Sequence, residues 1–434
     1  MTRLLVRGQI HTFDPARPLA SNVLLSDGVV EAVDSDIGQD VDTLELDPGD
    51  ILQPGWRDDH IHLLSTLASR CSFDLSDADS ISHLLERLSC ALPGGNGWIR
   101  AWGYEASSLV ERRHPTSHEL DRTTRGVPTV LHDRTGHVAV VNTAAARALG
   151  IQSQTDGVLV EREDILDRTP TLAVADLKTA AEELFSEWRR GGLVAITDAT
   201  HTNDVKAVDL LANIAETCGA PRITAMVGVD RLDGFRYGEI RRGIQVGHAK
   251  VMPDVQGVTD LGRLVRGAHE EGFPVAIHVM DIDTLEQALL ALEASRSPIN
   301  TVDRLEHCSL ALPEQLDRIR KLGVVVCTQP SFLRYRLDKY LNELSDVEHN
   351  WLWPLKSLIK RDIHVTFSSD SPVVPADPDE WIEAAISRPL GSGEDVTKDA
   401  AKKMAAVSTI TPGLAADMLV IANNHGCRPV TGWD

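Results

Sequence analysis

The chain has 434 residues, 42% of them hydrophobic, which is enough for one large domain plus a smaller one with a substantial buried core. Its 64 acidic and 43 basic side chains give a formal net charge of −21. This balance argues against nucleic-acid and anionic-membrane partners, since both draw affinity from cationic contacts. Six single cysteines without a C-x-x-C pair, and the lack of an apolar run of about 18 residues, predict a cytoplasmic protein.

Both ends of the chain are rich in short β-type segments. Up to about Asp47, strand-forming residues alternate with turns, and another β-type segment, LAADMLVIANN, lies near the carboxyl end. These two ends can pair with each other into one satellite sheet. We therefore predict a small β-sandwich domain built from residues 1–50 and 411–434.

Between these ends, residues 51–410 alternate apolar strand-type segments with amphipathic helical stretches, the pattern of parallel βα units. Nine strand candidates occur, whereas a closed (β/α)8 barrel has eight strands. Counting back from Asp370 places the candidate Thr129–Asp133 outside the barrel, in an insertion at about 63–190 over its mouth. The remaining strands are predicted to end at His62, Asp198, Asp230, Lys250, His278, His307, Gln329 and Asp370. The predicted fold class is α/β, a (β/α)8 TIM barrel.

The first barrel strand ends in a His-x-His pair within QPGWRDDHIHL. Alternate residues of a strand face the same side, so His60 and His62 project together at the carboxyl end of the strand, where TIM barrels carry their chemistry. Two such histidines can hold one metal ion, although an exposed strand face explains the pair equally well. His278 and His307 also close apolar strands, and four histidines at strand ends favour a metal site.

Asp370 and Lys250 also lie at predicted strand ends. In FSSDSP, Asp370 can bind a metal and accept a proton from water, or it can cap the following helix. An ammonium group has no lone pair for a cation, but carboxylation by carbon dioxide would turn Lys250 into an anionic ligand that bridges two ions. From residue chemistry alone, a buried or salt-bridged lysine is the simpler interpretation.

Segments spread over almost the whole chain carry a family resemblance. They include SDGVVEAVD, LQPGWRDDHIHL, GWIRAWGYEASSL, VPTVLHDRTGHVAVVNTAAARALGI, HAKVMPD, DRLEHCSL and FSSDSPVVPADPDEWIEAAISRP. In these segments the chain resembles the amidohydrolase superfamily, in particular the YtcJ-like branch that includes N-substituted formamide deformylases. The likeness implies a metal-dependent hydrolase with a binuclear centre.

The resemblance also assigns roles to residues. It places Lys250 on the carboxylated lysine of the family, and it places five residues on the metal-ligand positions: His60, His62, His278, His307 and Asp370. His137 and Asn142 in TGHVAVVN fall on a family element that implies substrate contact, with His137 as a catalytic residue at the developing oxyanion. Arg334 and Trp351, on a long segment after the seventh strand, are further substrate-binding candidates, although such residues often only pack.

The ligands imply a hydrolytic mechanism. Two divalent ions share a hydroxide of lowered pKa that attacks a polarised carbonyl, and Asp370 passes the hydroxide proton to the leaving amine. Zinc is the expected ion, and manganese, iron or cobalt also fit. The expected substrate is a small molecule with an acyl C–N bond in an amide, formamide, lactam or carbamate. The oligomeric state, including a homo-oligomer, stays open.

Three alternatives have different sequence requirements. A mononuclear deaminase of the same fold would use the histidines and Asp370 without the lysine, and Glu286 is its candidate acid after the fifth strand. A lactone or ester hydrolase would need the same machinery with less demand on the acid. A non-catalytic scaffold should have lost ligands, and none is missing from the sequence.

Overall fold

The structure is a computed structural model of the chain. It describes residues 3–35, 41–136, 138–151, 156–160, 162, 165, 168–253, 261–391, 393–422 and 427–430. The chain divides into two compact units. The barrel unit comprises Met1–Ile61, Leu184–Asp370 and Ala376–Asp434, and the insertion unit comprises His62–Glu183 and Ser371–Pro375.

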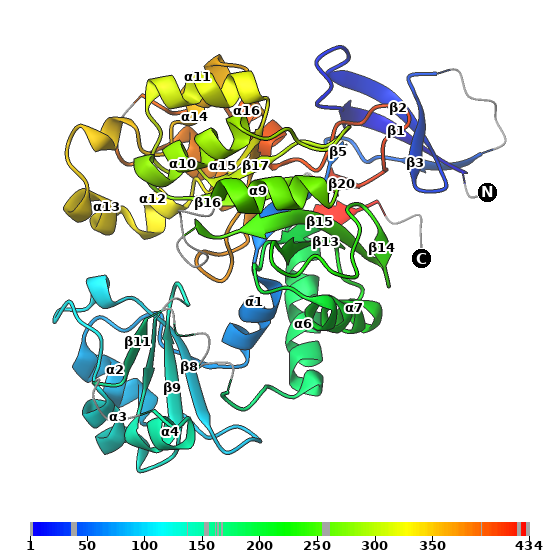
Figure 1. The fold of residues 1–434 in the computed structure, drawn as a ribbon. Coiled ribbons are helices and arrows are strands. Elements are labelled where there is room, and N and C mark those ends of the chain that lie inside the picture. Colours follow the sequence, from blue (N-terminus) through cyan, green and yellow to red (C-terminus); the bar gives the residue numbers. More distant parts are fainter. Residues whose placement is uncertain are drawn as a thin grey trace. The chain divides into compact units, whose positions relative to one another are not determined.

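The two ends of the chain form one sheet within the barrel unit (Figure 1). Its strands are β1 (Arg3–His11), β2 (Leu19–Ser26), β3 (Val29–Val33), β4 (Asp42–Glu45), β5 (Ile51–Pro54), β20 (Met418–Ile421) and β21 (Cys427–Pro429). Their order is β21-β20-β5-β1-β2-β3, with β4 paired to β1. The carboxyl-terminal strand β20 runs antiparallel to β5, and Val6, Ile10, Leu52 and Val420 are buried together in the core of this sheet. The predicted pairing of the two ends is confirmed.

Eight parallel strands form the barrel, in the order β19-β18-β17-β16-β15-β13-β12-β6. Their bounds are β6 (Trp56–Ile61), β12 (Leu193–Asp198), β13 (Arg222–Gly228), β15 (Ile244–Val251), β16 (Val275–Val279), β17 (Arg304–His307), β18 (Val325–Thr328) and β19 (Val365–Phe367). The short β14 (Ile240–Arg241) pairs antiparallel with β15. All eight strands end within three residues of the predicted positions, so the predicted (β/α)8 architecture is confirmed.

The barrel closes between its first and last strands through the segment that follows β19. The backbone N–H of Asp370 donates to the carbonyl of His60 over 2.8 Å. Both the N–H and the hydroxyl of Ser369 donate to the buried carboxylate of Asp58, over 3.1 and 2.5 Å. Because these bonds join the two strand ends directly, Asp370 lies beside His60 although 309 residues separate them in the sequence.

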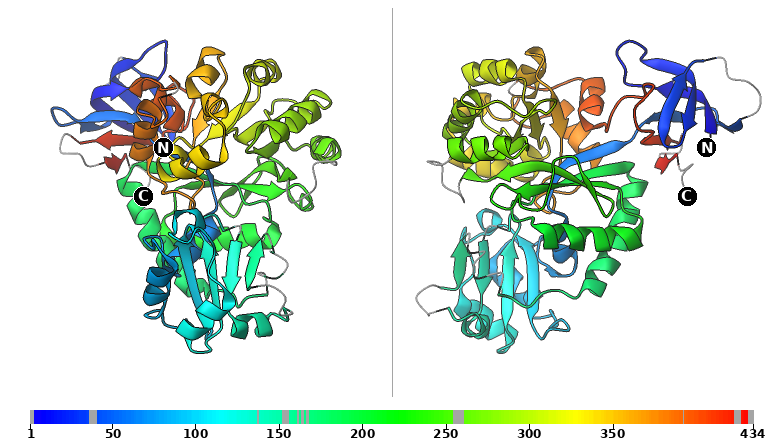
Figure 2. Two further views of the ribbon diagram at one scale, coloured as in Figure 1. Left: turned by 90° about the vertical axis from the view of Figure 1, so that its left-hand side faces the viewer. Right: turned by 45° about the vertical axis from the view of Figure 1, so that its right-hand side comes forward.

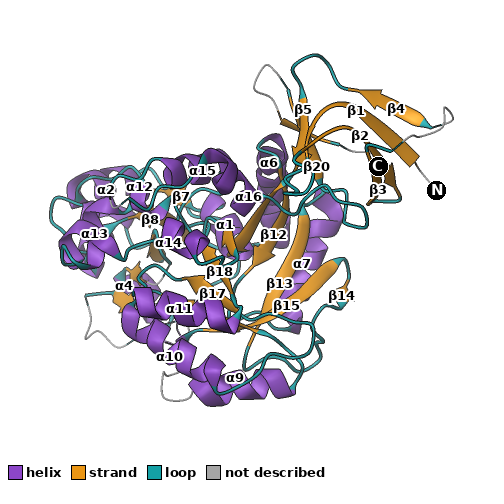
Figure 3. Cartoon of the chain, turned by 90° about the horizontal axis from the view of Figure 1, so that it is seen from above, coloured by secondary structure: helices purple, strands orange, loops and turns teal. Residues whose placement is uncertain are grey.

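Helices follow the barrel strands, and Figure 3 shows α9, α10 and α11 in a row outside β15 and β17. Their bounds are α6 (Val174–Arg190), α7 (Val205–Cys218), α9 (Leu261–Glu270), α10 (Ile282–Glu293), α11 (Pro313–Leu322), α12 (Phe332–Tyr335), α13 (Leu337–Glu343), α14 (Leu355–Lys360), α15 (Pro378–Ile386) and α16 (Lys398–Ala405). Asp281 directly precedes α10, and its side chain accepts the N–H of Thr284, a typical N-cap. Among the helices that the structure describes, none is both long and apolar enough to cross a membrane.

The insertion unit has a five-stranded sheet of its own, coloured cyan in Figure 2. Its strands, in the order β11-β10-β9-β8-β7, are β7 (Phe73–Asp74), β8 (Ile99–Tyr104), β9 (Thr129–Asp133), β10 (Val138–Val141) and β11 (Val158–Val160). Its helices are α1 (Leu63–Arg70), α2 (Ile81–Leu88), α3 (Ser117–Thr124) and α4 (Thr143–Ala148). The strand Thr129–Asp133 therefore lies outside the barrel, as predicted.

Each face of this sheet has a separate apolar cluster. One contains Ile99 and Ala101 of β8 and packs with α2 and α3, while the other contains Trp98 and Val130 and packs with α4. Since successive residues of a strand face opposite sides, Arg100 lies between Ile99 and Ala101 but on the face of Trp98. This places the cation of Arg100 on a sheet face that also holds Trp98, Val130, and His132 stacked on Trp102.

Candidate metal centre

His60 lies at the centre of a group of polar side chains at the carboxyl ends of the barrel strands. Its side chain is 1% exposed, and its Nδ1 is 2.5 Å from the carboxylate of Glu306. Burial, and then the charge of Lys250, lower the pKa of His60 to about 3, so the imidazole is neutral near pH 7. With its Nδ1–H donated to Glu306, the ring presents the lone pair of Nε2 on its other side.

Lys250 and Asp370 lie next to that lone pair. The Nζ of Lys250 is 3.4 Å from His60 Nε2, and the Oδ1 of Asp370 is 3.5 Å from it. Lys250 is 1% exposed. Burial lowers its pKa, and the negative charges of Glu306 and Asp370 oppose this shift only in part. The structure thus brings three residues from β6, β15 and the end of β19 to one point.

His307 and His278 extend the group along the barrel rim. The ring centroid of His307 lies 4.8 Å from that of His60 and 4.6 Å from that of His278. Burial lowers the pKa of both His278 and His307, which favours neutral imidazoles. The Nδ1 of His307 lies 2.8 Å from Gln329 Oε1, and the amide of Gln329 donates to Ser368. If Nδ1–H of His307 donates to Gln329, the lone pair of the neutral ring is on Nε2, which can then accept or bind a metal ion.

We call His60, Lys250, His278, His307 and Asp370 the strand-end cluster. His62 directly follows β6, and one ligand atom each of His60, His62 and Asp370 lies within 4.8 Å of the others. All six residues that the sequence singled out for metal binding are therefore found in this region of the structure. Groups of neutral imidazoles and a carboxylate are typical of transition-metal sites.

The backbone at two cluster residues is held in an uncommon conformation. His307 has φ of 66° and Asp370 has φ of 59°, both in the left-handed region that non-glycine residues seldom occupy. Such residues cost of order 1–3 kcal/mol each and persist where the surroundings fix them, which is frequent at functional sites. The hydrogen bond from Asp370 N to His60 O fixes one of them.

Sequence reasoning missed the partners of His60. Glu306 is 0% exposed and accepts from Arg304 through Nε over 2.8 Å and Nη2 over 3.1 Å. Burial alone would raise the pKa of Glu306, but Arg304 and the His60 hydrogen bond hold it well below its usual value. Arg304 also donates to the carbonyl of Asp59 over 2.9 Å. The available signal was two charged residues in a four-residue central strand, since central parallel strands are normally apolar throughout.

Phe332 of α12 was also missed. Its ring stacks on His307 at 6.4 Å and meets the buried Trp353 edge-on at 5.5 Å. Trp353 in turn packs on Tyr340. An aromatic wall thus borders the histidines on the side of β18, and it can exclude water from that part of the site.

The predicted substrate-binding residues do not gather in the same way. Arg334 is exposed and lies 3.8 Å from Glu383 of α15, while Trp351 is half-buried and its carbonyl accepts the N–H of Ala311. Arg334 thus takes part in a surface ion pair, and Trp351 packs against its neighbours. Within the described part of the chain, neither residue contacts the strand-end cluster.

Asn142 has a structural place in the insertion unit. It is 0% exposed and caps α4, because its Oδ1 accepts the N–H groups of Thr129 and Ala145. Its Nδ2 donates to Thr124 and Val127. Since both ends of the amide are engaged, the substrate-binding role predicted for Asn142 finds no support in its surroundings. His137, predicted to be catalytic, lies outside the described residues.

A parallel barrel with imidazoles and a carboxylate at the carboxyl ends of its strands defines the class of barrel hydrolases that use metal ions. The model of the family Amidohydro_3, described as an amidohydrolase family, matches residues 48–415. The chain belongs to this family, and the predicted resemblance to the amidohydrolases is confirmed. It is accordingly an enzyme, a metal-dependent hydrolase.

Individual relatives agree with this assignment. The N-substituted formamide deformylase of Arthrobacter pascens is 26% identical, over 95% of this chain and 89% of the relative. The protein YtcJ of Bacillus subtilis (strain 168) is 24% identical, over 78% of this chain and 74% of the relative. In fold, the chain is similar to an uncharacterized metal-dependent hydrolase from Pyrococcus furiosus, with a TM-score of 0.76, 23% identity, and 96% and 98% of the two chains covered.

Proposed function

We propose that this enzyme hydrolyses an acyl C–N bond of a small molecule, in an amide, formamide, lactam or carbamate. The observation that carries the proposal is the convergence of His60, Lys250 and Asp370, from three distant strands, within 3.5 Å contacts at the barrel rim. The name of the Arthrobacter pascens relative, a formamide deformylase, supports the C–N bond as the one that is cleaved.

The donor set fits divalent ions. Two ligand atoms at about 2.1 Å from a tetrahedral ion lie about 3.4 Å apart, and His60 Nε2 and Asp370 Oδ1 are 3.5 Å apart. The residues that would hold ions are His60, His62, Lys250, His278, His307 and Asp370. We propose a binuclear centre, with zinc as the first choice because imidazole nitrogen dominates the set, and manganese, iron or cobalt as other fitting ions.

Lys250 fits this centre as a carbamate. Its amine is buried beside His60, and burial lowers its pKa, which favours the neutral form. A neutral amine has the lone pair that adds to carbon dioxide, with release of one proton, to form an N-carboxylate. That anion would offset the cost of burying two cations and give each of them an oxygen ligand.

The residues of the chain then have defined tasks. Bound divalent ions would supply a Lewis acid for the carbonyl and lower the pKa of water toward neutrality. Asp370 accepts a proton at its carboxylate and hands it to the amine nitrogen that leaves. Glu306 fixes the tautomer and the direction of His60. The wall of Phe332 and Trp353 keeps water away from one side of the histidines.

A deaminase is less well supported than an amide hydrolase. The acid that such an enzyme would need after the fifth strand was predicted at Glu286. In the structure Glu286 lies on α10, where both carboxylate oxygens are 2.7 Å from Arg318 and one is near Gln315. A carboxylate engaged in a surface ion pair of this kind is poorly placed for proton transfer at the barrel rim.

The decisive experiment is a substrate screen with defined metal content. Protein purified without metal is loaded with zinc, manganese, iron or cobalt and assayed on N-benzylformamide, acetanilide, a cyclic imide, a carbamate, a lactone and an aminopurine. We expect turnover of at least one C–N substrate, with activity lost on chelation; the formamide and the anilide should release one amine per formate or acetate formed. Turnover confined to the lactone, or to ammonia release from the aminopurine, would overturn the proposal.

A further inference from the structure

The insertion unit contains a cavity that has no residue in common with the strand-end cluster. It encloses about 660 Å³ and is lined by residues from the end of α1, the segment before β8, β8 itself and the start of α6. This volume is within the range of pockets that bind small organic molecules. All of its lining residues lie between Arg70 and Asp176, so the cavity belongs to the insertion unit alone.

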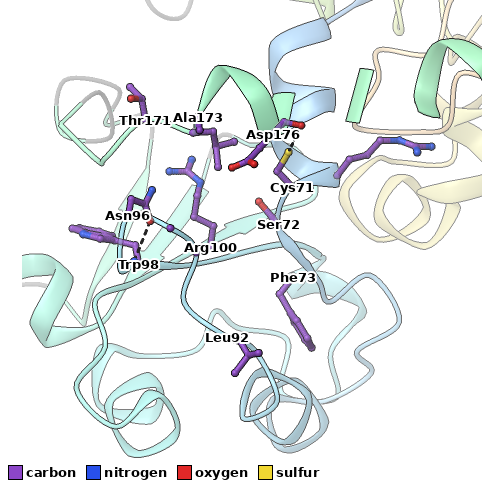
Figure 4. A pocket seen from close by; sticks show the side chains of 14 residues that line it. Cys71, Ser72, Phe73, Leu92, Asn96, Trp98, Arg100, Thr171, Ala173 and Asp176 are labelled. Atoms are coloured by element: carbon purple, nitrogen blue, oxygen red, sulfur yellow. Dashed lines mark hydrogen bonds between the residues drawn. The ribbon is translucent and has the colours of Figure 1, made fainter. Parts of the chain in front are cut away.

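Arg100 of β8 stands in the middle of this cavity (Figure 4). Trp98 and Asn96 lie on one side of its guanidinium group and Cys71 and Asp176 on the other. Among the described residues, its hydrogen bond is the one from Nη1 to the hydroxyl of Thr169, over 3.3 Å. Its Nε is buried without a partner. A guanidinium group has five N–H donors, so the described part of the chain uses only a small share of the donor capacity of Arg100.

No neighbouring group of the described chain supplies the missing negative charge. Burial, then the charge of Asp176, raises the pKa of the Cys71 thiol, so the thiol stays neutral at pH 7. Asp176 is exposed, and its carboxylate forms no ion pair with Arg100 within the described residues. Burial lowers the pKa of Arg100. A half-buried cation without a carboxylate is costly, because it has lost hydration and gained no charge partner.

The other residues that line the cavity indicate what kind of molecule could bind there. Trp98 is buried, Phe73 is half-buried and Leu92 is an exposed leucine at the rim. Phe73 pairs with Ala101 and packs on the other face of the sheet, so Trp98, on the face of Arg100, is the aromatic side chain that offers apolar surface to the ligand. The charged residues that line the cavity are Arg70, Arg100 and Asp176, with a net charge of plus one, so a single carboxylate matches the lining better than a dianion such as phosphate.

We propose that this cavity is a second binding site, separate from the metal centre, for a small monocarboxylate with an apolar body. The carboxylate binds the guanidinium group of Arg100 through two parallel hydrogen bonds, the geometry in which arginine holds carboxylates best. The apolar body contacts Trp98. The site takes up the free compound from solution and forms no covalent bond with it.

Phenylacetate is a suitable probe, and binding to the full-length enzyme is measured by calorimetry. We expect Arg100→Met to weaken binding at least about tenfold, because a charge-assisted pair is lost. Arg100→Lys keeps the charge without the two-pronged geometry and should fall in between. Arg122→Met is the matched control, since this arginine is exposed on α3 and outside the cavity. 2-Phenylethanol, which lacks the carboxylate, should bind at least tenfold more weakly than phenylacetate.

A second readout does not depend on changing Arg100. Phenylacetate should alter the fluorescence of the wild-type protein, and Trp98→Phe should remove that change. Because carboxylates also bind metal ions, every titration is repeated on metal-free protein and on Asp370→Asn. We expect binding to survive both changes, and we expect Arg100→Met to retain hydrolytic activity.

Several results would overturn the proposal. These are no binding of phenylacetate to the wild type, equal binding to wild type and Arg100→Met, or binding that disappears with the metal. Tighter binding of inorganic phosphate than of phenylacetate would overturn the carboxylate class. None of these outcomes bears on whether the metal centre cleaves a C–N bond, so the two proposals fail independently.

Discussion

The strand-end cluster and the cavity of the insertion unit handle buried charge in opposite ways. At the barrel rim, Arg304 meets Glu306, and Glu306 meets His60, with distances of 2.5 to 3.1 Å. In the insertion unit, the hydrogen-bond partner of Arg100 within the described residues is one neutral hydroxyl, at 3.3 Å. A paired network costs little to keep and holds its members in one geometry, whereas an unpaired cation gains stability when a ligand arrives.

The two sites differ in whether their polar groups are oriented before a ligand or metal ion binds. The barrel prepares its imidazoles before any ion binds, because the carboxylate of Glu306 already selects the tautomer of His60. The cavity leaves the decisive contact to the ligand. We therefore expect mutations in the cluster to change chemistry and stability together, and mutations in the cavity to change binding alone.

The largest effect is expected for Asp370→Asn. It removes a carboxylate oxygen 3.5 Å from His60 and with it the proton acceptor. We expect kcat/KM to fall at least about 10³-fold, near the upper range for loss of a general acid–base group. Activity on the best C–N substrate measures the loss of chemistry, and a denaturant curve measures any change in stability. Asp362→Asn, at a side chain that is 91% exposed, should leave both unchanged.

The second largest effect is expected for Lys250→Met, which tests whether the lysine carries a bridging carbamate. We expect the number of ions bound per chain to fall from two to one and kcat to fall by about 10²-fold or more, since an ion contributes several kcal/mol to such a transition state. Metal analysis gives the stoichiometry. Under ¹³C-labelled carbon dioxide, the wild type should show a carbamate carbon resonance that Lys250→Met lacks. The same resonance in both proteins would contradict the assignment.

Glu306→Gln breaks the paired network directly. Arg304 would lose its only strong charge partner in the strand, and we expect unfolding to become easier by about 3–5 kcal/mol, as for other broken buried pairs. Metal affinity should fall about 10- to 100-fold because His60 loses its orienting carboxylate. Urea denaturation and metal titration measure these changes, with the exposed Glu314→Gln as control. Unchanged metal affinity would mean that His60 needs no orientation from Glu306.

The smallest effect concerns a surface pair of the insertion unit. The hydrogen bond from Arg113, together with the capping box at Thr116, lowers the pKa of Glu119 to about 2, from an ordinary value of 4.5. A lowered folded-state pKa stabilises the fold above about pH 4.5, and this contribution is lost as the pH falls toward 2. We expect Glu119→Gln to cost less than about 1 kcal/mol at pH 7 and nothing near pH 2. Denaturation at several pH values checks this, and a cost that grows in acid would contradict it.

Much of the fold was readable in the sequence because parallel barrel strands repeat a simple pattern. Short segments such as PVAIHV and RLEHC form β16 and β17, which end within one residue of the predicted His278 and His307. Counting strands was enough to place Thr129–Asp133 outside the barrel. The site residues could be proposed for the same reason, since the carboxyl ends of parallel strands meet at one rim.

Other residues could not be judged from the pattern around them. Asn142 follows a strand in a sequence that resembles a substrate-binding element, yet its amide is used to cap α4 and to tie Thr129 in place. Nothing in the sequence near Arg100 distinguishes it from any surface arginine. That it has no charge partner among the residues the structure describes depends on what α1 and α6 bring beside it, which is a matter of contacts between distant segments.

The sequence by itself determined the alternation of strands and helices, the pairing of the two ends, and the chemical types present at the strand ends. Only the tertiary structure decided that Glu306 and Arg304 support His60, that the end of β19 closes against β6, and that Arg100 faces a cavity. The physical reason is that periodicity is a local property of the chain. Burial and charge pairing, by contrast, are set by residues that are far apart in sequence and meet only on folding.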